Sequence, residues 1–109
     1  MYVVMNRFAI VKGREADFEN SWKTRESFLK TFAGFRNFAL LRNDMPSDSG
    51  TTEYVSHTIW RAKADFDAWR TSQEFNRAHG GASMMGVVAG PPQVSLYEAV
   101  IEETNEAAV

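Results

Sequence analysis

The segment at residues 66–79 reads FDAWRTSQEFNRAH and is followed by a pair of glycines. Phe66 and Trp69 are three residues apart, so a helix places their rings on one side. Phe75 and His79 are four residues apart and share one side of a second helical piece with Ala78. The segment therefore turns large apolar side chains and one imidazole toward the interior, and the rest of the chain is organised around it.

A break in this helix decides whether Trp69 and His79 face the same space. An unbroken helix would turn the two side chains about 80° apart. Thr71-Ser72 is the predicted break, with Ser72 as the N-cap of the second piece, so that both side chains point into one cavity. Gly80-Gly81 ends the helix directly after the histidine. His79 is thus a candidate metal or haem ligand, and the alternative is a surface histidine at a helix C-terminus, where the helix dipole favours the imidazolium.

The composition is that of one small domain spanning residues 1–109 and excludes several classes of function. The net charge is −2 and basic residues form no cluster, so nucleic acid is not expected as a partner. The absence of cysteine excludes a disulfide scaffold, a thiolate nucleophile and an iron–sulfur cluster. Because no basic leader and no run of 18 apolar residues occur, the chain is expected to be cytoplasmic and not to bind a membrane.

Apolar periodicity predicts an α+β fold with the element order β-α-β-β-α-β. A first helix is predicted from Glu15 to about Lys30, the segment described above forms the second, and residues 102–109 are expected to be a frayed tail. The predicted strands are Tyr2–Val11, Phe35–Arg42, Glu53–Arg61 and Gln93–Glu102. This order is typical of the ferredoxin-like unit, an antiparallel four-stranded sheet with both helices on one face. The other face is left apolar and uncovered, which predicts packing against a second copy of the chain.

Two polar residues interrupt apolar surfaces and are candidate binding residues. Asn6 lies on the strand face that carries Tyr2, Val4, Phe8 and Ile10, where an unpaired amide costs about 1–3 kcal/mol. Either backbone or water satisfies it, or a ligand does. Arg25 lies within the helical stripe of Phe18, Trp22, Leu29 and Phe32, so its guanidinium needs a carboxylate from the protein or from a ligand, or it reaches solvent along its apolar stem.

Two further features have simpler interpretations. His57 shares a strand face with Val55 and Ile59, and no glycine-lined space or second histidine lies near it in sequence, so it is interpreted as structural. The segment from Ala82 to Pro92 combines methionine and valine with small residues and is predicted to be a loop that folds over a ligand, with disorder or core contact as the alternative.

Together these residues form a pattern that resembles a known family. The chain is similar to the antibiotic-biosynthesis-monooxygenase (ABM) superfamily of dimeric α+β barrels, and within it to the bacterial haem-degrading monooxygenases of the Isd type. The similarity covers nearly the whole chain. The residues that carry it are Asn6-Arg7, Trp22-x-x-Arg25, Gly34-Phe35, Trp60, Phe66-x-x-Trp69 and His79 ten residues further on.

The resemblance implies a role for each candidate residue. His79 would be the axial ligand of the haem iron, Asn6 would donate its amide to a ligand on the opposite side of the iron, and Trp69 would press on the porphyrin and ruffle it. Arg25 would be a candidate to contact a propionate or to give the pocket its polarity, and the apolar walls would be Trp22, Phe66 and Phe75. Haem would be both cofactor and substrate, cleaved with dioxygen to a linear tetrapyrrole and free iron for iron acquisition. The chain has no flavin or nicotinamide motif, so an external reductase would supply the electrons.

Two other classes of function remain open at the level of sequence. A cofactor-free monooxygenase of an aromatic quinol or a polyketide would use the same cavity without His79 as a ligand. A haem carrier or sensor would bind haem through His79 and leave it intact. The three functions can be separated by adding haem and then oxygen with a reductant. A haem degrader destroys the bound haem, a carrier keeps it intact, and a cofactor-free monooxygenase does not need it.

Overall fold

The core of the chain is one antiparallel sheet of four strands, seen in a computed structural model that describes residues 1–45, 49–73, 75 and 86–105. The strand order is β2-β3-β1-β4. β1 lies between β3 and β4, and β2 forms an edge beside β3. The strands are β1 (Tyr2–Val11), β2 (Phe35–Arg42), β3 (Thr51–Trp60) and β4 (Gln93–Glu98). The predicted ferredoxin-like α+β class is confirmed.

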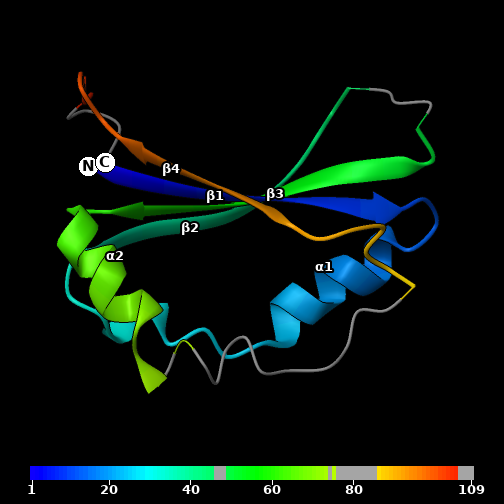
Figure 1. Ribbon diagram of the computed structural model, residues 1–109, viewed down its shortest axis with the longest axis horizontal. Coiled ribbons are helices and arrows are strands. Elements are labelled where there is room, and N and C mark those ends of the chain that lie inside the picture. The colour runs from blue at the N-terminus through cyan, green and yellow to red at the C-terminus, as the bar shows by residue number, and fades with distance from the viewer. Residues whose placement is uncertain (46–48, 74, 76–85, 106–109) are drawn as a thin grey trace.

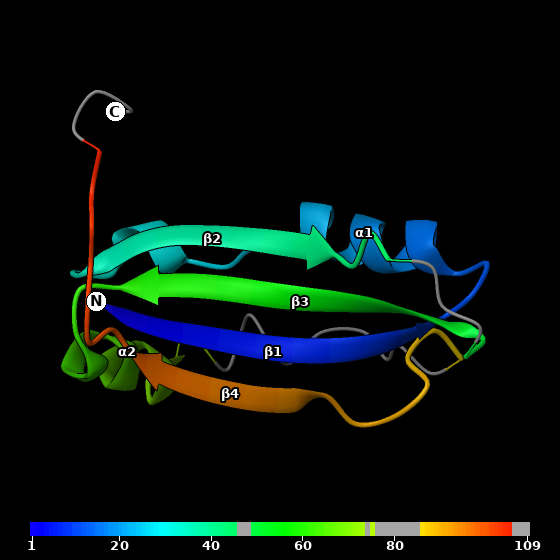
Figure 2. The same ribbon diagram turned by 90° about the horizontal axis from the view of Figure 1, so that it is seen from above.

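Both helices lie on one side of this sheet, as Figure 1 shows, and we call it the helix side. The helices are α1 (Glu15–Thr24) and α2 (Lys63–Arg70). The opposite side, which we call the open side, faces the viewer in Figure 2 and carries no helix. Alternation along each strand sends every second side chain to the helix side, where Ile10, Tyr54 and Trp60 are fully buried. His57 is on the open side with its cross-strand partners Met5 and Ala39.

The first helix is shorter than the sequence pattern predicts. It ends at Thr24 instead of about Lys30, because Arg25 takes an extended backbone conformation with φ −75° and ψ 151°. Phe28 then adopts a left-handed conformation with φ 61°, and a single 3₁₀ turn, η1 (Leu29–Thr31), follows. Leu29 still reaches the core at 5 % exposure. The apolar spacing therefore predicted correctly that Leu29 is buried. It did not predict that a turn, instead of a continuous helix, brings this residue to the core.

Three strands also depart from their predictions. β3 runs from Thr51 to Trp60 and not from Glu53 to Arg61. β4 ends at Glu98 and not at Glu102, and Val100 and Ile101 beyond it are exposed. In β2 the pairing with β3 shifts register between Phe35 and Asn37. Because this bulge adds one residue, Phe35 packs into the same core as Phe38, although simple alternation puts them on opposite faces.

The predicted break in the central helix is confirmed. α2 begins at Lys63 and ends with Thr71 as its C-cap. The Ser72 hydroxyl donates to the Trp69 carbonyl at 2.6 Å and accepts the backbone N–H of Phe75 at 3.0 Å. This second bond has the geometry of an N-cap, so the chain starts a new turn where the sequence indicated. His79 lies outside the described residues.

The segment before β4 packs against β1 where the structure describes it. Val87 is 4 % exposed and belongs to the core, and its carbonyl accepts the backbone N–H of Val11. Val88 forms an isolated bridge with Ile10. The core-contact interpretation is therefore correct for these residues, and the lid interpretation is wrong for them. Residues 82–85 lie outside the described part of the chain.

Candidate functional site

The core on the helix side is divided into two clusters of buried residues. Among the described residues, the first cluster consists of Tyr2, Leu29, Trp60, Phe66 and Trp69. The second consists of Ile10, Phe18, Tyr54 and Val87. On β1 the first cluster is joined by Val4 and the second by Phe8. Asn6 lies between these two positions, so the polar residue that the sequence singled out marks the boundary between the clusters.

The side-chain carbonyl oxygen of Asn6 lies unsatisfied at this boundary. The backbone of Asn6 pairs with Ser56 of β3 and Val94 of β4. Its Oδ1 atom is buried and has no hydrogen-bond partner in the described part of the chain. An amide left in this state costs about 1–3 kcal/mol. Because the expected partners in backbone or side chains are not found, Asn6 is available to a ligand or to water.

Arg25 is held on an aromatic surface at the end of α1. Its guanidinium carbon lies 4.5 Å from the centroid of the Trp22 ring and 4.8 Å from that of Phe38. The two rings stack on each other at 5.6 Å. Arg25 Nε is buried without a hydrogen-bond partner, and none of the ion pairs among the described residues includes this side chain. Burial lowers the pKa of the guanidinium.

This arrangement favours an anionic ligand. A guanidinium that stacks on two rings and lacks a carboxylate can form charge-assisted hydrogen bonds with an incoming one. Arg25 is half-buried with its Nε atom inside the protein, so the alternative in which the end of the side chain reaches solvent along its apolar stem stays open.

Trp69 stands at the centre of an aromatic group formed by α2 and its neighbours. It is 5 % exposed and stacks on Trp60 with ring centroids 6.5 Å apart. Phe75 meets it edge-on at 5.5 Å and Phe32 at 5.2 Å. Phe66, 8 % exposed, packs against Trp60. Two of the three predicted wall residues, Phe66 and Phe75, are therefore brought together with Trp69 in the first cluster.

Trp22 lies in a different group from Trp69. It packs with Phe8 and Phe18 of the second cluster. Its contact with Phe38 connects it to the first cluster, because Phe38 packs there. Trp22, Arg25 and Phe38 thus bridge the two clusters on the side of β2. The described residues do not show whether His79 joins them.

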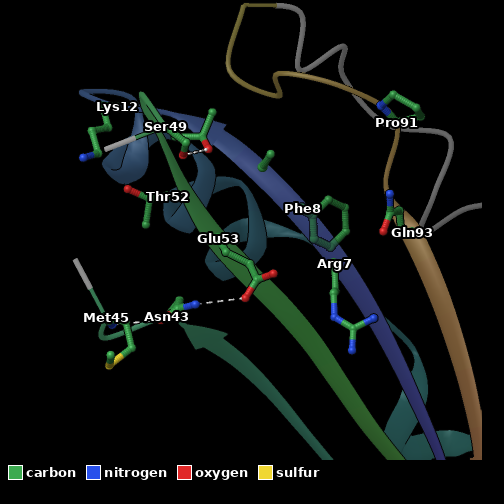
Figure 3. A pocket seen from close by; sticks show the side chains of 12 residues that line it. Arg7, Phe8, Lys12, Asn43, Met45, Ser49, Thr52, Glu53, Pro91 and Gln93 are labelled. Atoms are coloured by element: carbon green, nitrogen blue, oxygen red, sulfur yellow. Dashed lines mark hydrogen bonds between the residues drawn. The ribbon is translucent and has the colours of Figure 1, made fainter. Parts of the chain in front are cut away.

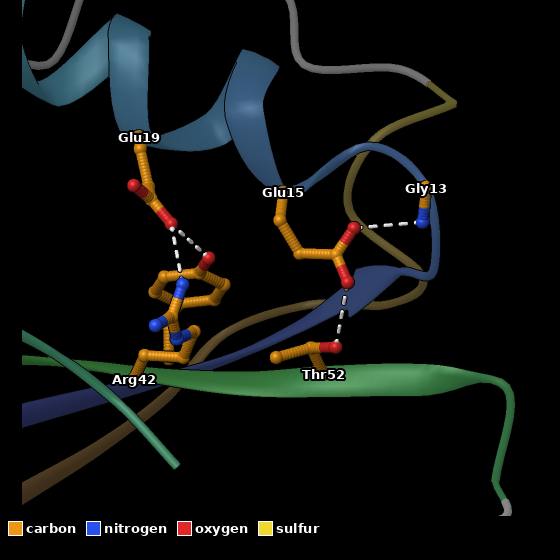
Figure 4. A network of polar contacts seen from close by, with 6 residues as sticks. Gly13, Glu15, Glu19, Arg42 and Thr52 are labelled. Carbon is orange, nitrogen blue, oxygen red and sulfur yellow. Dashed lines mark hydrogen bonds and ion pairs between the residues drawn. The ribbon is translucent and has the colours of Figure 1, made fainter. Parts of the chain in front are cut away.

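Sequence reasoning missed a polar network beneath α1. Figure 4 shows Glu15 and Glu19 reaching from α1 toward the sheet. The Tyr54 hydroxyl and Arg42 Nη1 both donate to Glu19 Oε2. Burial and the hydrogen bond to Glu19 raise the pKa of Tyr54 to about 12. The only signal in the sequence is a carboxylate on the inner side of an amphipathic helix, and it does not identify its partner.

Of the pockets formed by described residues, two large ones are lined by neither Asn6 nor Trp69. The larger, of about 520 Å³, lies at one end of the sheet, where Arg7, Glu53 and Gln93 line it (Figure 3). The other, of about 490 Å³, lies between α1 and β2 and is lined by Trp22, Phe38 and Tyr54 among others. Trp22 is therefore a predicted site residue that borders the second of these two pockets.

Two searches of the described residues gave negative results. No three of the histidine, aspartate and glutamate side chains there lie close enough together to hold a metal ion. In the same part of the chain, no helix has both the length and the apolar character needed to cross a membrane.

Comparison with known proteins agrees with this fold. A family model described as antibiotic biosynthesis monooxygenase matches residues 1–81. A solved structure of a putative monooxygenase of this kind from Bacillus cereus is 17% identical, with a TM-score of 0.76 over 95% of each chain.

Two other similar structures have different printed functions. The haem degrader MhuD from Mycobacterium tuberculosis, solved with two haems in its active site, is 23% identical, with a TM-score of 0.68 over 95% of this chain and 100% of that one. SnoaB from Streptomyces nogalater, described as a cofactor-independent oxygenase, is 21% identical, with a TM-score of 0.67 over 96% of each chain. At these identities the likenesses establish the fold alone.

Proposed function

Because the chain belongs to the antibiotic biosynthesis monooxygenase family, we propose that it is a monooxygenase that degrades haem. In this reaction dioxygen and electrons from an external reductase open the porphyrin to a linear tetrapyrrole and release iron. Within the family fold, haem degraders and cofactor-independent oxygenases both occur. The substrate must therefore be argued from the side chains of this chain.

The observation that supports haem is the pairing of an aromatic interior with unsatisfied polar atoms. Haem is flat and apolar over most of its surface and carries two carboxylates at one edge. Arg25, stacked on two rings and without a carboxylate among the described residues, suits a propionate. Asn6 Oδ1 is buried without a described partner at the boundary of the aromatic clusters, so this acceptor suits a hydrogen-bond donor on a ligand or a water, while the N–H groups of the same amide would donate to a ligand of the iron.

The other proposed residues would bind or shape the ring. Trp69 and Phe66 belong to a rigid group of packed rings, so an aromatic wall there resists displacement by a bound ligand. Trp22 would contact the porphyrin from the side of α1, and Phe75 from beyond the break. His79, outside the described residues, would hold the iron through a neutral imidazole. Bound haem would supply the iron at which dioxygen is reduced.

The open side of the sheet supports a homodimer as the functional unit. Val3, Met5, Val55 and Ile59 are half-buried there, and Leu41 and Tyr97 are 46% and 47% exposed. An apolar sheet face of this kind is normally covered, and a second copy of the chain covers it with a self-complementary contact. Each copy would carry its own site on its helix side. We also propose a cytoplasmic location, where a soluble reductase could act as the electron donor.

A haemin titration followed by reduction tests the proposed function. We expect a Soret band that saturates at one haem per chain and decays when ascorbate or a reductase is added in air. His79→Ala should abolish this binding while the circular dichroism spectrum is unchanged, because it removes the proposed iron ligand. The matched control is His57→Ala, which removes a histidine from the open side and should leave the band unchanged.

Each contrary result identifies another function. A Soret band that persists under reductant and oxygen would show a haem carrier. The lack of any Soret band, together with oxidation of an aromatic quinol without added cofactor, would show a cofactor-free monooxygenase. An unchanged band in His79→Ala would refute the ligand assignment.

A further inference from the structure

The pocket between α1 and β2, which we call the α1–β2 pocket, lies beside the proposed haem site and has its own chemistry. Its volume of about 490 Å³ is within the range of small-molecule sites. Helix α1 lines it with Glu19, Trp22 and Lys23, which share one face of the helix because they are three and four residues apart. Strand β2 lines it with Phe38 and Arg42. Of the described residues that we propose to hold haem, only Trp22 lines this pocket.

The apolar part of the α1–β2 pocket is mainly aromatic. The rings of Trp22 and Phe38 stack with an interplanar angle of 21° and centroids 5.6 Å apart. Both residues are only half-buried, so part of their apolar surface is open to a ligand. The side chain of Leu40 and the ring of Tyr54 also line the pocket. A flat aromatic ligand can cover this surface and stack on the ring pair.

The charged side chains of the pocket favour an anion. Among the described residues that line it, Lys23 and Arg42 are cations and Glu19 is the one carboxylate. The Tyr54 hydroxyl donates to Glu19 Oε2, and burial together with this hydrogen bond raises the pKa of Tyr54 to about 12. The phenol is therefore neutral at neutral pH and adds no negative charge. Two cations against one carboxylate attract an anionic ligand.

Both cations are available to such a ligand. Lys23 is exposed in the last turn of α1, and its ammonium group forms no hydrogen bond or ion pair with another described residue. Arg42 Nη1 lies 3.4 Å from Glu19 Oε2, and the Arg42 side chain is 63% exposed (Figure 4). An ion pair this exposed contributes little, so the guanidinium can turn to a ligand carboxylate and bind it with two parallel hydrogen bonds.

We propose that the α1–β2 pocket binds a small planar aromatic carboxylate. The ring of this ligand stacks on Trp22 and Phe38, and its carboxylate binds to Lys23 and Arg42. An uncharged aromatic ligand would leave the two cations without a partner, and an inorganic anion would leave the rings uncovered. None of these contacts requires haem, so the inference goes beyond the proposed function and does not rest on it.

Calorimetric titration of the haem-free protein with naphthalene carboxylate tests the site. We expect binding that saturates at one ligand per chain. Two analogues separate the contributions to affinity. Naphthalene methanol keeps the flat rings without the charge, and decalin carboxylate keeps the charge without a flat ring. Each analogue should bind at least about tenfold more weakly, because each loses one of the two kinds of contact.

Nuclear magnetic resonance locates the bound ligand, because the three tryptophans of the chain lie in different surroundings. Naphthalene carboxylate should shift the indole N–H resonance of Trp22 and leave those of Trp60 and Trp69 in place. The spectrum of Trp22→Phe assigns the resonance. A ligand that shifts Trp69 and not Trp22 would occupy the first core cluster, and this result would overturn the proposal.

Two charge-reversal variants form a matched pair. Lys23→Glu and Lys30→Glu both change an exposed lysine, but Lys30 lies in η1 and does not line the pocket. We expect Lys23→Glu to weaken the binding of naphthalene carboxylate on the order of tenfold, and Lys30→Glu to bind as the wild type does. Circular dichroism should show the same fold in both variants, because neither side chain is buried.

The remaining outcomes decide against the site. A wild type that does not bind naphthalene carboxylate saturably would overturn the proposal. Equal affinity for the carboxylate and either analogue would refute the ligand class, and equal affinity of Lys23→Glu and the wild type would refute the binding mode. All these measurements are made without haem. The lack of a Soret band on addition of haemin would therefore refute the proposed function alone, and a failure of this site would leave the haem result unchanged.

Discussion

Replacing Arg25 separates its role in binding from its role in the fold. Arg25→Met keeps a long apolar stem over Trp22 and Phe38 and removes the guanidinium. If Arg25 binds a propionate, the variant loses one charge-assisted hydrogen bond, a contribution of about 1.5–3 kcal/mol. Since about 1.4 kcal/mol corresponds to a tenfold change, the dissociation constant for haemin should rise about 10- to 150-fold.

The ligand-free stability should change little in the same variant, because two contributions oppose each other. The unsatisfied Nε atom costs about 1–3 kcal/mol in the wild type, and its removal relieves this cost. The two ring contacts, at 4.5 and 4.8 Å, contribute about 0.5–1 kcal/mol each and are lost. We therefore expect the free energy of unfolding in urea to lie between about 1 kcal/mol below and about 2 kcal/mol above that of the wild type.

Haemin titrations of three variants complete the design. Arg36→Met removes the same charge from an exposed position on β2 and should bind as the wild type does. Arg25→Lys keeps the charge without the planar fork and should recover only part of the affinity. Wild-type affinity in Arg25→Met would refute the propionate contact. A loss of several kcal/mol in its ligand-free stability would show instead that Arg25 is a structural residue.

Three further predictions concern other parts of the molecule. The pKa of Tyr54 is raised to about 12 in the folded protein, against 10.0 ordinarily. The protonated hydroxyl therefore contributes stability that is fully present below pH 10 and is lost as the pH rises toward 12. The free energy of unfolding in urea should show this loss in the wild type and not in Tyr54→Phe. Ile59→Lys places a charge on the open side of the sheet and should convert the proposed homodimer to a monomer in light scattering, whereas a wild type that is already monomeric would refute the dimer. Trp69→Phe should bind haem and degrade it more slowly, because a smaller ring presses less on the porphyrin; full activity with an intact fold would refute that role.

The fold was predictable because burial repeats along the sequence with the period of each element. β1 and β2 have the predicted bounds, and Ser72 caps a new turn as expected. Failures occur where local turns replace regular structure. Leu29 fits a helical stripe, but it reaches the core through η1, after Phe28 has taken a left-handed conformation that sequence gives no reason to expect of phenylalanine.

The candidate site was predictable only where a polar residue interrupts an apolar pattern. Asn6 and Arg25 were recognised in this way, and both have buried polar atoms without described partners. The neighbours of Asn6 across the sheet were not predictable, because they depend on the β1–β3 register, which places Ser56 directly beside Asn6. The register is set by long-range strand pairing and by turns. The alternation of apolar and polar residues along one strand does not specify it.

The buried polar atoms without described partners belong to Asn6, Arg25 and Trp60, and their surroundings differ. Trp60 Nε1 also lacks a described partner, but Trp60 is 0% exposed and packed among Phe35, Phe66 and Trp69. The free-energy cost of this unsatisfied N–H group therefore remains whether or not a ligand is bound. The costs of Asn6 and Arg25, about 1–3 kcal/mol each, are a large part of the 5–15 kcal/mol by which a domain is typically stable. A ligand that satisfies both must stabilise the fold, and it does so at the boundary of the two core clusters, where packing alone leaves the interior incomplete.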